Sequence, residues 1–459
     1  MAEVGTGIVV QKFGGTSVAT PEAREQAARK AIEARYRGQF PVLVVSAIGR
    51  KGAPYHTDTL IELGREIDPD IEPRELDLLM ACGEIISTVV MAATIKAMSR
   101  LETVALTGGQ AGITTDGVFG KARIVSVNPS QILSSVRERK IPIIAGFQGV
   151  SREDSEPGKP HTHGAITTLG RGGSDTTAAA VAAALEADAC EIYTDVDGVM
   201  TADPRIVPEA RTLRTVSYAE ICEMAHQGAR VLHPRCAEIA MEHRIPLWVK
   251  NTFSDSPGTL ITETAQEERT SPVTGVVNSG PVAHVTLAIA EEEDRAQVAL
   301  ELYRLLATAD ISIYFLSATA ETISFVVDRD RLRNLRDVLN GVVIPVEHDG
   351  RLRFYVVCAD PRSPVFAVQE RILTREGRAF HTQVVQVEIG ENARIVSLIG
   401  SGMQNTVGIM ARVARTLNDA GVTVQQMADS KISLSCLVSE EQMVTAVRAL
   451  HEEFIEHGQ

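Results

Sequence analysis

The chain has 459 residues, of which 44% are hydrophobic and 23% charged, and its formal net charge at pH 7 is −14. This composition predicts an ordinary globular protein of roughly two to four domains. The acidic balance argues against a nucleic-acid partner, which favours a basic face. We find no run of about 18 apolar residues and therefore expect no membrane span. Six scattered cysteines without a C-x-x-C pair, and no signal-peptide pattern in residues 1–7, predict a cytoplasmic protein with reduced thiols.

Strand and helix patterns alternate over residues 1 to about 265. Near-continuous apolar runs occur at residues 7–11, 41–47, 104–107, 141–147, 189–194 and 245–249. Helical stretches lie between them; at one of these, Thr20 suits an N-cap and Pro21 the first helical position. Apolar strands that alternate with helices predict an α/β fold, with a mostly parallel sheet covered by helices on both sides.

The composition changes around residues 254–275, where Ser, Thr, Glu and Pro predict a linker. Beyond it, the order strand, helix, strand, strand, helix occurs twice. The first set covers residues 284–289, 295–309, 311–317, 322–327 and 331–339, and the second covers 394–399, 408–420, 422–427, 431–438 and 441–453. This weak internal repeat predicts two ferredoxin-like units. Residues 342–382 between them receive no assignment.

The first apolar run ends in Lys12-Phe13-Gly14-Gly15-Thr16-Ser17. Glycine has no Cβ, so phosphate oxygens can approach the backbone N–H groups closely. A lysine beside them supplies a point charge for a phosphoryl group in transfer. The lysine precedes the glycines, so this is not a Walker motif. Taken alone, the segment could also be a plain strand-to-helix turn.

Five further segments place polar or charged groups at the ends of the predicted strands. They are residues 46–49 with 56–59, 80–84, 170–175, 194–205 and 250–251. Gly170–Asp175 leads into an alanine-rich helix, whose N-terminus suits a carboxylate or phosphate, and Arg171 adds a fork for bidentate carboxylate binding. Each acid could by itself be a turn or surface residue. Their coincidence at the strand ends of one α/β domain indicates a ligand site.

In these segments the chain resembles the aspartokinases of the amino-acid-kinase superfamily, joined to two ACT regulatory domains, and the resemblance extends over essentially its whole length. Residues 11–17, 80–84, 170–175 and 194–205 carry the resemblance; residues 49–55, 199–203, 427–430 and 449–451 look most like the aspartokinase I type that diaminopimelate inhibits. The resemblance implies a three-layer α/β/α kinase domain over residues 1–265. It further implies ferredoxin-like (βαββαβ) ACT units over 266–345 and 386–459, separated by an unassigned insertion at 346–385.

The resemblance also implies roles for individual residues in phosphoryl transfer from Mg-ATP to L-aspartate. Lys12 would neutralise the moving phosphoryl group, and Asp175 would organise lysines and metal-bound phosphates. Glu84 would hold the α-ammonium of aspartate and Arg171 its α-carboxylate. Further substrate contacts would come from Thr57, Gly172, Gly173 and Ser174. The ATP site would be lined by Lys12, Phe13, Gly14, Gly15, Ser46, Thr194, Asp195, Met200, Arg205, Lys250 and Asn251. We expect no metal to be held directly by the protein.

Regulation is expected from the ACT units, which commonly pair between chains, so the resemblance implies at least a homodimer. The effector contacts would be Ser401, Gly402, Met403, Gln425, Asp429 and Ser430. Diaminopimelate is the first candidate effector, lysine the second and threonine the third.

Two departures and two alternatives stay open. Many aspartokinases carry Tyr where Met200 stands. The loop at residues 151–164 is longer than the family requires and contains His161 and His163. We expect these two histidines to be solvated, because no third metal ligand is near. The alternative functions are a kinase of glutamate or acetylglutamate and a non-catalytic ACT amino-acid sensor. Residues 80–84 and the tandem C-terminal units argue against the first. The intact Lys12, Arg171 and Asp175 argue against the second.

Overall fold

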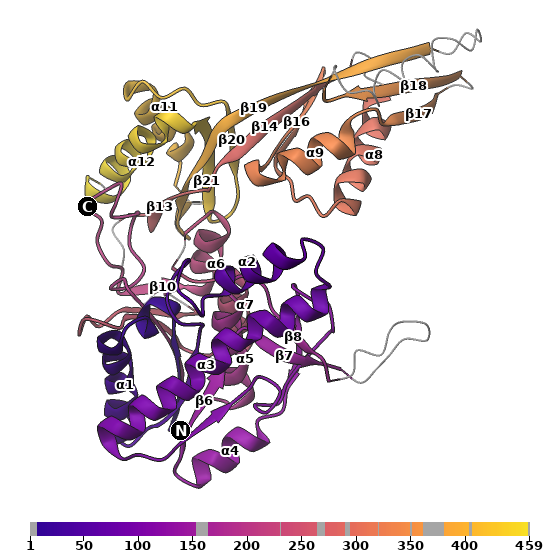
Figure 1. The fold of residues 1–459 in the computed structure, drawn as a ribbon. Helices are drawn as coiled ribbons and strands as arrows, with labels where there is room; N and C mark the ends of the chain where they lie inside the picture. The colour runs from indigo at the N-terminus through magenta and orange to yellow at the C-terminus, as the bar shows by residue number, and fades with distance from the viewer. Residues whose placement is uncertain are drawn as a thin grey trace. The chain divides into compact units, whose positions relative to one another are not determined.

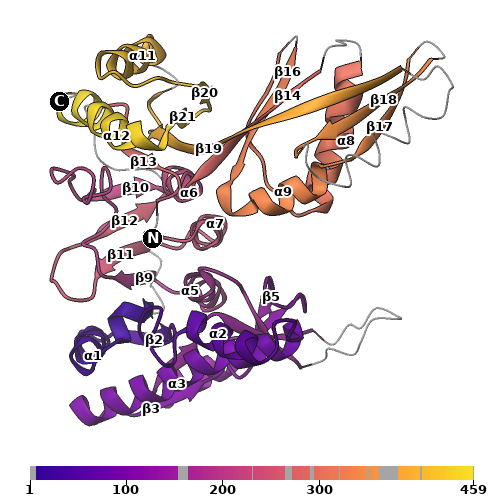
Figure 2. The same cartoon turned by 45° about the horizontal axis from the view of Figure 1, so that its top comes forward.

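A computed structural model describes residues 7–152, 164–229, 231–263, 271–289, 294–319, 321–348, 351–360, 381–403 and 406–457. The chain forms two compact units, shown in Figures 1 and 2. The first comprises Met1–Pro204 and Pro208–Thr270, and the second comprises Arg205–Val207 and Ser271–Gln459. His161 and His163 lie outside the described residues.

The N-terminal unit is built on an eight-stranded sheet in the order β10-β12-β11-β9-β1-β2-β6-β3. Its strands are β1 (Ile8–Phe13), β2 (Phe40–Val45), β3 (Thr103–Leu106), β6 (Ile141–Ala145), β9 (Ala189–Thr194), β10 (Thr215–Ser217), β11 (Leu247–Asn251) and β12 (Thr259–Thr262). Neighbours pair in parallel except β11 and β12. The mostly parallel sheet expected from the apolar runs is confirmed.

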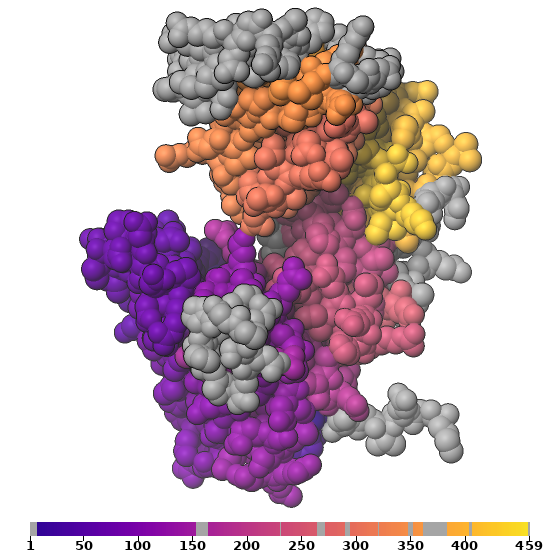
Figure 3. Space-filling view, turned by 90° about the vertical axis from the view of Figure 1, so that its right-hand side faces the viewer, coloured from indigo at the N-terminus to yellow at the C-terminus, as the bar shows by residue number. Residues whose placement is uncertain are grey.

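Helices cover both faces of this sheet. On one face lie α1 (Pro21–Tyr36) and α3 (Pro73–Ser99), whose apolar residues share a core with Phe13 and Tyr193. On the other lies α5 (Gly173–Ala184), which packs on β1 and β9 and against α7 (Pro234–Glu242). The remaining helices are α2 (Thr57–Ile67), α4 (Ser130–Arg137) and α6 (Tyr218–His226). In Figure 3 the residues up to 152 and those from 164 onward lie against each other, and both belong to this unit.

Local sequence explains where the first helix begins. The Thr20 side chain accepts a hydrogen bond from the Ala23 N–H at 3.2 Å, and Pro21 occupies the first helical position. A hydroxyl N-cap satisfies one of the free N–H groups of the first turn, and proline has none to leave unpaired. The predicted cap is therefore confirmed.

A small second sheet lies beside the main one, in the order β5-β4-β7-β8. Its strands are β4 (Ile113–Thr115), β5 (Ile124–Val127), β7 (Gln148–Ser151) and β8 (Ile166–Thr168). Helix α3 packs on β8. The sequence did not predict this sheet, because its strands are three or four residues long and partly polar.

Helix α3 is long and apolar enough to cross a membrane by length and composition alone. It nevertheless buries two carboxyl side chains, Asp77 and Glu84, and packs against α1, α2 and β8. A core helix of a globular protein can be equally long and apolar, so this helix is only weak evidence for a membrane span.

The C-terminal unit contains one nine-stranded sheet. Its strands are β13 (Gly275–Asn278), β14 (Val282–Ala288), β15 (Tyr314–Ala318), β16 (Thr322–Asp328), β17 (Val343–His348), β18 (Arg351–Cys358), β19 (His381–Ile399), β20 (Gln426–Asp429) and β21 (Ser433–Ser439). Its helices are α8 (Arg295–Thr308), α9 (Leu332–Leu339), α11 (Ile409–Asp419) and α12 (Met443–His451). Both predicted repeats of strand, helix, strand, strand, helix are present.

The long strand β19 joins the two ferredoxin-like parts, as Figure 1 shows. Its first residues pair with β18 and β14, and its last residues pair with β21 and β13. Two details differ from the sequence prediction. Strand β13 lies within the predicted first unit but pairs in the second, and the predicted boundary between residues 345 and 346 falls inside β17. The reason is that β19 is long enough to need different partners along its length, which local patterns cannot reveal.

Candidate active site

Lys12 and Asp175, the two predicted catalytic residues, meet in the structure. Lys12 is the penultimate residue of β1, and Asp175 lies in the first turn of α5. The Lys12 Nζ atom is 2.6 Å from Asp175 Oδ1, and both side chains are mostly buried, at 12% and 13% exposure. The pair lies on the sheet face that α5 covers. The carboxylate holds the ammonium at the end of the strand, where parallel sheets bind ligands.

The two glycines after Lys12 allow close backbone approach. A Cβ on Gly15 would lie 2.5 Å from the Gly49 carbonyl oxygen and 2.9 Å from that of Ala47, so only glycine fits there. A Cβ on Gly14 would lie 3.5 Å from Lys12 Nζ, in the space beside the ammonium. Bare backbone next to a cation is a cradle that suits phosphate oxygens. Ser46 borders it, with its N–H donating to the Phe13 carbonyl.

Glu84 is a buried carboxyl group with an open oxygen. It is 2% exposed, and Oε1 accepts a hydrogen bond from the Ala47 N–H at 3.0 Å. Oε2 is buried and has no hydrogen-bond partner among the described residues. Burial raises the pKa of Glu84 to about 8, against the hydrogen bond from Ala47. A buried acid of this kind is poised to accept a cationic group.

Gly83 lets the helix that carries Glu84 approach the loop after β2. A Cβ on Gly83 would lie 2.6 Å from the Tyr55 carbonyl oxygen and 3.0 Å from Ala47 Cβ. Ala47 therefore contacts Glu84 on one side and the Gly15 backbone on the other. The phosphate cradle and the buried acid share this loop, and Thr57, the first residue of α2, follows it.

The predicted carboxylate-binding turn enters α5 through two left-handed glycines, Gly170 (φ 72°) and Gly172 (φ 70°). Arg171 between them is exposed, whereas Ser174 is buried against Gly146, where a Cβ would lie 2.7 Å from the serine Oγ. The His233 ring lies against Gly172, and a Cβ there would be 2.1 Å from His233 Cδ2. Left-handed backbone and this contact both require glycine at position 172.

His233 was not predicted from the sequence. Burial lowers its pKa, which favours the neutral imidazole beside the site, although nearby Asp175 opposes the shift. No local pattern marks it, because it is a lone histidine before the proline that starts α7.

The segment after β9 holds the next predicted residues. Asp195 is exposed and pairs with Arg50 at 2.7 Å, another contact that the sequence did not suggest. Asn251 donates to Asp197 Oδ1 at 2.7 Å, and hydrogen bonds from Ser254 and then Asn251 lower the pKa of Asp197. Thr194 is the last residue of β9. Met200 forms an isolated β-bridge with Thr212. Arg205 is exposed and is assigned by its contacts to the C-terminal unit.

Lys250 is not brought together with Lys12. In the sheet register Lys12 is level with Ile192, whereas Lys250 is level with Tyr193 and points to the opposite face. There its Nζ contacts Glu191 Oε1 at 2.5 Å and lies over the Trp248 ring. One position along a strand reverses a side chain, so Lys250 and Lys12 lie on opposite faces of the sheet, and a role of Lys250 in the ATP site stays a prediction.

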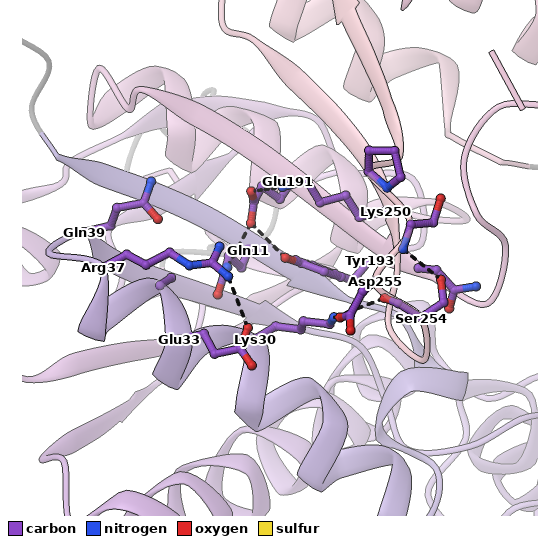
Figure 4. Close-up of a pocket in the computed structure, with 14 residues that line it drawn as sticks. Gln11, Lys30, Glu33, Arg37, Gln39, Glu191, Tyr193, Lys250, Ser254 and Asp255 are labelled. Atoms are coloured by element: carbon purple, nitrogen blue, oxygen red, sulfur yellow. Dashed lines mark hydrogen bonds and ion pairs between the residues drawn. The ribbon is translucent and has the colours of Figure 1, made fainter. Parts of the chain in front are cut away.

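Figure 4 shows the cavity that Lys250 lines, on the α1 side of the sheet. Its volume is about 240 Å³, and its floor carries Gln11, Glu191 and Tyr193. Glu191 accepts hydrogen bonds from both Gln11 and Tyr193, and Lys30 pairs with Asp255 across the opening. The charged side chains of this cavity are paired with one another, Lys250 with Glu191 and Lys30 with Asp255.

The described residues contain no group of three or more His, Cys, Asp or Glu side chains that could hold a metal ion. Asp175 pairs with Lys12 beside the phosphate cradle, whereas Glu84 is buried and bonds to the Ala47 N–H. A divalent cation therefore fits this site only as the partner of a bound polyphosphate, with Asp175 as the protein's contribution.

The predicted effector residues are divided between two places in the C-terminal unit. Gly400 N–H donates to the Ile432 carbonyl, which puts the Ser401–Met403 turn beside Ser430 and Asp429. Gln425 instead donates to Leu437, four positions along β21 from Ser433 and therefore roughly 14 Å away along the strand. The structure brings together the turn at Ser401–Met403 with Asp429 and Ser430 and leaves Gln425 apart.

Comparison with known proteins agrees with this geometry. The sequence matches the amino acid kinase family over residues 7–251 and the ACT domain over residues 396–454. It is 37% identical over 449 residues to the aspartokinase of Mycolicibacterium smegmatis, covering 97% of this chain and 96% of that protein. The chain belongs to the aspartokinase family. It is also 36% identical over 451 residues to aspartokinase 1 of Bacillus subtilis (strain 168), covering 97% of this chain and 98% of that protein.

The fold is shared with aspartokinases of known structure. Escherichia coli aspartokinase III in complex with aspartate and ADP superposes with a TM-score of 0.70 at 23% identity, covering 97% of this chain and 99% of that one. The expected fold class, a three-layer kinase domain followed by ACT units, is confirmed.

Proposed function

We propose that this aspartokinase-family chain transfers the γ-phosphoryl group of ATP to the β-carboxylate of L-aspartate, forming 4-phospho-L-aspartate. The observation that carries this proposal is the convergence of two features on the Ala47 loop. One is the Lys12–Asp175 pair with its glycine cradle, and the other is the buried Glu84 with an open oxygen. The first suits a phosphoryl group and the second an ammonium group.

The substrate is held by its α-amino-acid end. Glu84 Oε2 accepts a hydrogen bond from the α-ammonium of aspartate. The positive charge of the ammonium stabilises the ionised carboxylate, which is buried and has no cationic partner of its own among the described residues. Arg171, in the turn before α5, binds the α-carboxylate with its planar fork. The β-carboxylate is then directed toward the phosphoryl group beside Lys12.

Little proton chemistry is required, because the acceptor carboxylate is already ionised. Its oxygen attacks the γ-phosphorus, the bond to the β,γ-bridging oxygen breaks, and ADP leaves with the electron pair. Lys12 neutralises charge that develops on the transferred group, and Asp175 keeps the ammonium in place. The backbone of Gly14 and Gly15 and the segment from Thr194 to Met200 hold the nucleotide. Mg²⁺ supplies charge neutralisation on the phosphates when bound.

The wider role follows from the family. The product is the first intermediate on the route to lysine and diaminopimelate, threonine and methionine, and the enzyme is cytoplasmic. An amino-acid effector binds beside the Ser401–Met403 turn and Asp429, with diaminopimelate ahead of lysine and threonine. Escherichia coli aspartokinase III, 23% identical to this chain, has also been crystallised in complex with lysine and aspartate. The ACT units pair between chains, which gives at least a homodimer.

Hydroxylamine trapping tests the substrate. The enzyme is given ATP, Mg²⁺ and either aspartate, glutamate or N-acetylglutamate, and the acyl hydroxamate is measured. Aspartate should be used at least about a hundredfold better than the others, because Glu84 and Arg171 fix the chain length between clamp and phosphoryl group. Preference for glutamate or acetylglutamate would instead establish the alternative kinase. Binding of amino acids without hydroxamate from any substrate would favour a non-catalytic sensor.

A further inference from the structure

Asp77 is a buried acid that has no part in the mechanism above. It lies on α3, seven residues before Glu84, and is 1% exposed. Seven residues are about two helical turns, so both carboxyl groups project from the same face of α3. The two acids differ in one respect: Glu84 has an open oxygen, and Asp77 has none.

The Asp77 carboxylate is fully bonded to backbone and hydroxyl donors. The Gly120 N–H lies 3.0 Å from Oδ1 and 2.9 Å from Oδ2. Thr168 donates its N–H to Oδ2 at 2.8 Å and its Oγ1 hydroxyl to Oδ1 at 2.8 Å. Burial raises the pKa of Asp77, and these hydrogen bonds oppose the shift. A carboxylate is the side chain that can accept from all these donors at once.

The two partners of Asp77 flank the turn that carries Arg171. Thr168 ends β8, three residues before Arg171, and its carbonyl accepts from the Ala122 N–H at 2.9 Å. Gly120 contacts the turn from the other side, since a Cβ on Gly170 would lie 3.2 Å from the Gly120 oxygen. Asp77 therefore ties both supports of the Arg171 turn to the helix that carries Glu84.

We propose that Asp77 is a positioning residue, which fixes the Arg171 turn relative to Glu84 so that α3 sets the spacing between the two groups that clamp the amino acid. This inference rests on the proposed function. Loss of the tie should loosen Arg171 while leaving Lys12, Asp175 and the glycine cradle in place. The effect should therefore fall on aspartate and spare ATP.

Four variants separate this role from general stability. Asp77→Ala removes every bond of the tie. In Asp77→Asn the amide oxygen can still accept from the Gly120 and Thr168 N–H groups, and its NH₂ can donate to the Thr168 hydroxyl. Thr168→Val removes one bond without a change of shape. Thr167→Val is the matched control, because Thr167 is also fully buried but its hydroxyl pairs with Thr115 at 2.6 Å, away from Asp77.

Steady-state kinetics should show that KM for aspartate rises about tenfold or more in Asp77→Ala and about threefold in Thr168→Val. In both variants KM for ATP should stay within about twofold of the wild-type value. Asp77→Asn should stay within about threefold of the wild type, and Thr167→Val should match it. Equal KM values for aspartate in Thr168→Val and Thr167→Val would overturn the proposal, and this comparison stands even if Asp77→Ala does not fold.

Amide hydrogen exchange gives a readout that does not depend on turnover. A peptide spanning residues 168–174 should exchange faster in Thr168→Val than in Thr167→Val. Unchanged exchange would refute the tie itself. Absence of aspartate phosphorylation by the wild type would refute the proposed function, and the exchange data would still decide whether Asp77 holds this turn.

Discussion

Glu84→Gln is the substitution whose consequences follow most directly from the structure. The amide keeps the shape and can still accept from the Ala47 N–H, but it can neither ionise nor balance an ammonium group. Removing one partner of a buried charge pair between protein and ligand costs about 2–5 kcal/mol. KM for aspartate at pH 8.5 should therefore rise on the order of 10²-fold, while KM for ATP changes little.

The pH dependence makes this prediction sharper. With a pKa of about 8, Glu84 is about 1% ionised at pH 6 and about half ionised at pH 8 in the free enzyme. Only the ionised form binds the ammonium well, so kcat/KM for aspartate should rise about fifty-fold between these pH values. In Glu84→Gln this rise should be absent. A wild-type profile that is flat from pH 6 to 8, or an unchanged rise in the variant, would refute the assignment.

The free energy of unfolding should fall as pH rises, whereas kcat/KM for aspartate should rise. The folded-state pKa of Glu84, about 8, lies above its ordinary value of 4.5, so the native state binds more protons between these pH values. The wild type thus loses stability relative to Glu84→Gln as pH rises through this window, by about 5 kcal/mol at most. Urea denaturation at pH 5 and pH 8.5 measures it. Glu220→Gln is the control, because Glu220 is also buried but bonds to Ser217 at the start of α6.

Three further predictions test other parts of the account. Lys12→Ala should lower kcat by about 10²-fold or more with a smaller change in KM for ATP, because the charge acts mainly on the transition state; near-normal kcat in the folded variant would remove Lys12 from the mechanism. Gly172→Ala should lower kcat/KM for aspartate, because position 172 has a left-handed backbone and an added Cβ would clash with the His233 ring. A second substitution, His233→Ala, should restore part of the loss. No restoration would mean that the ring contact is not the cause. Asp429→Ala should raise the diaminopimelate, lysine or threonine concentration for half-maximal inhibition about tenfold, measured by titration, and an unchanged value for all three would move the effector site elsewhere.

The catalytic unit could be predicted closely from its sequence because its signals are local. Apolar runs mark buried strands, Thr20 and Pro21 mark a helix start, and a lysine before two glycines marks a strand end that suits phosphate. Glu84 and Arg171 were found as parts of compact motifs. That Glu84 and the glycine cradle converge on the Ala47 loop is consistent with a sheet whose parallel strands end at one edge.

The remaining features depend on contacts between residues far apart in the chain. Lys250 was assigned to the ATP site through the family resemblance, but the face of the sheet on which it lies depends on a register that the sequence does not specify. Strand β13 pairs with a strand more than a hundred residues later, which no local repeat predicts. Asp77 could have been found, since its seven-residue spacing from Glu84 places both on one helix face once residues 73–99 are recognised as a helix.

The central claim is that the β-carboxylate of aspartate receives the phosphoryl group. The most direct measurement is to incubate the enzyme with Mg-ATP and aspartate, reduce the acyl phosphate with borohydride, and identify the amino-acid product. A β-aspartyl phosphate yields homoserine, and we predict homoserine in proportion to ADP formed, at a rate lowered by about 10²-fold or more in Lys12→Ala. ADP formation without homoserine, or a reduced product from glutamate in place of aspartate, would contradict the account.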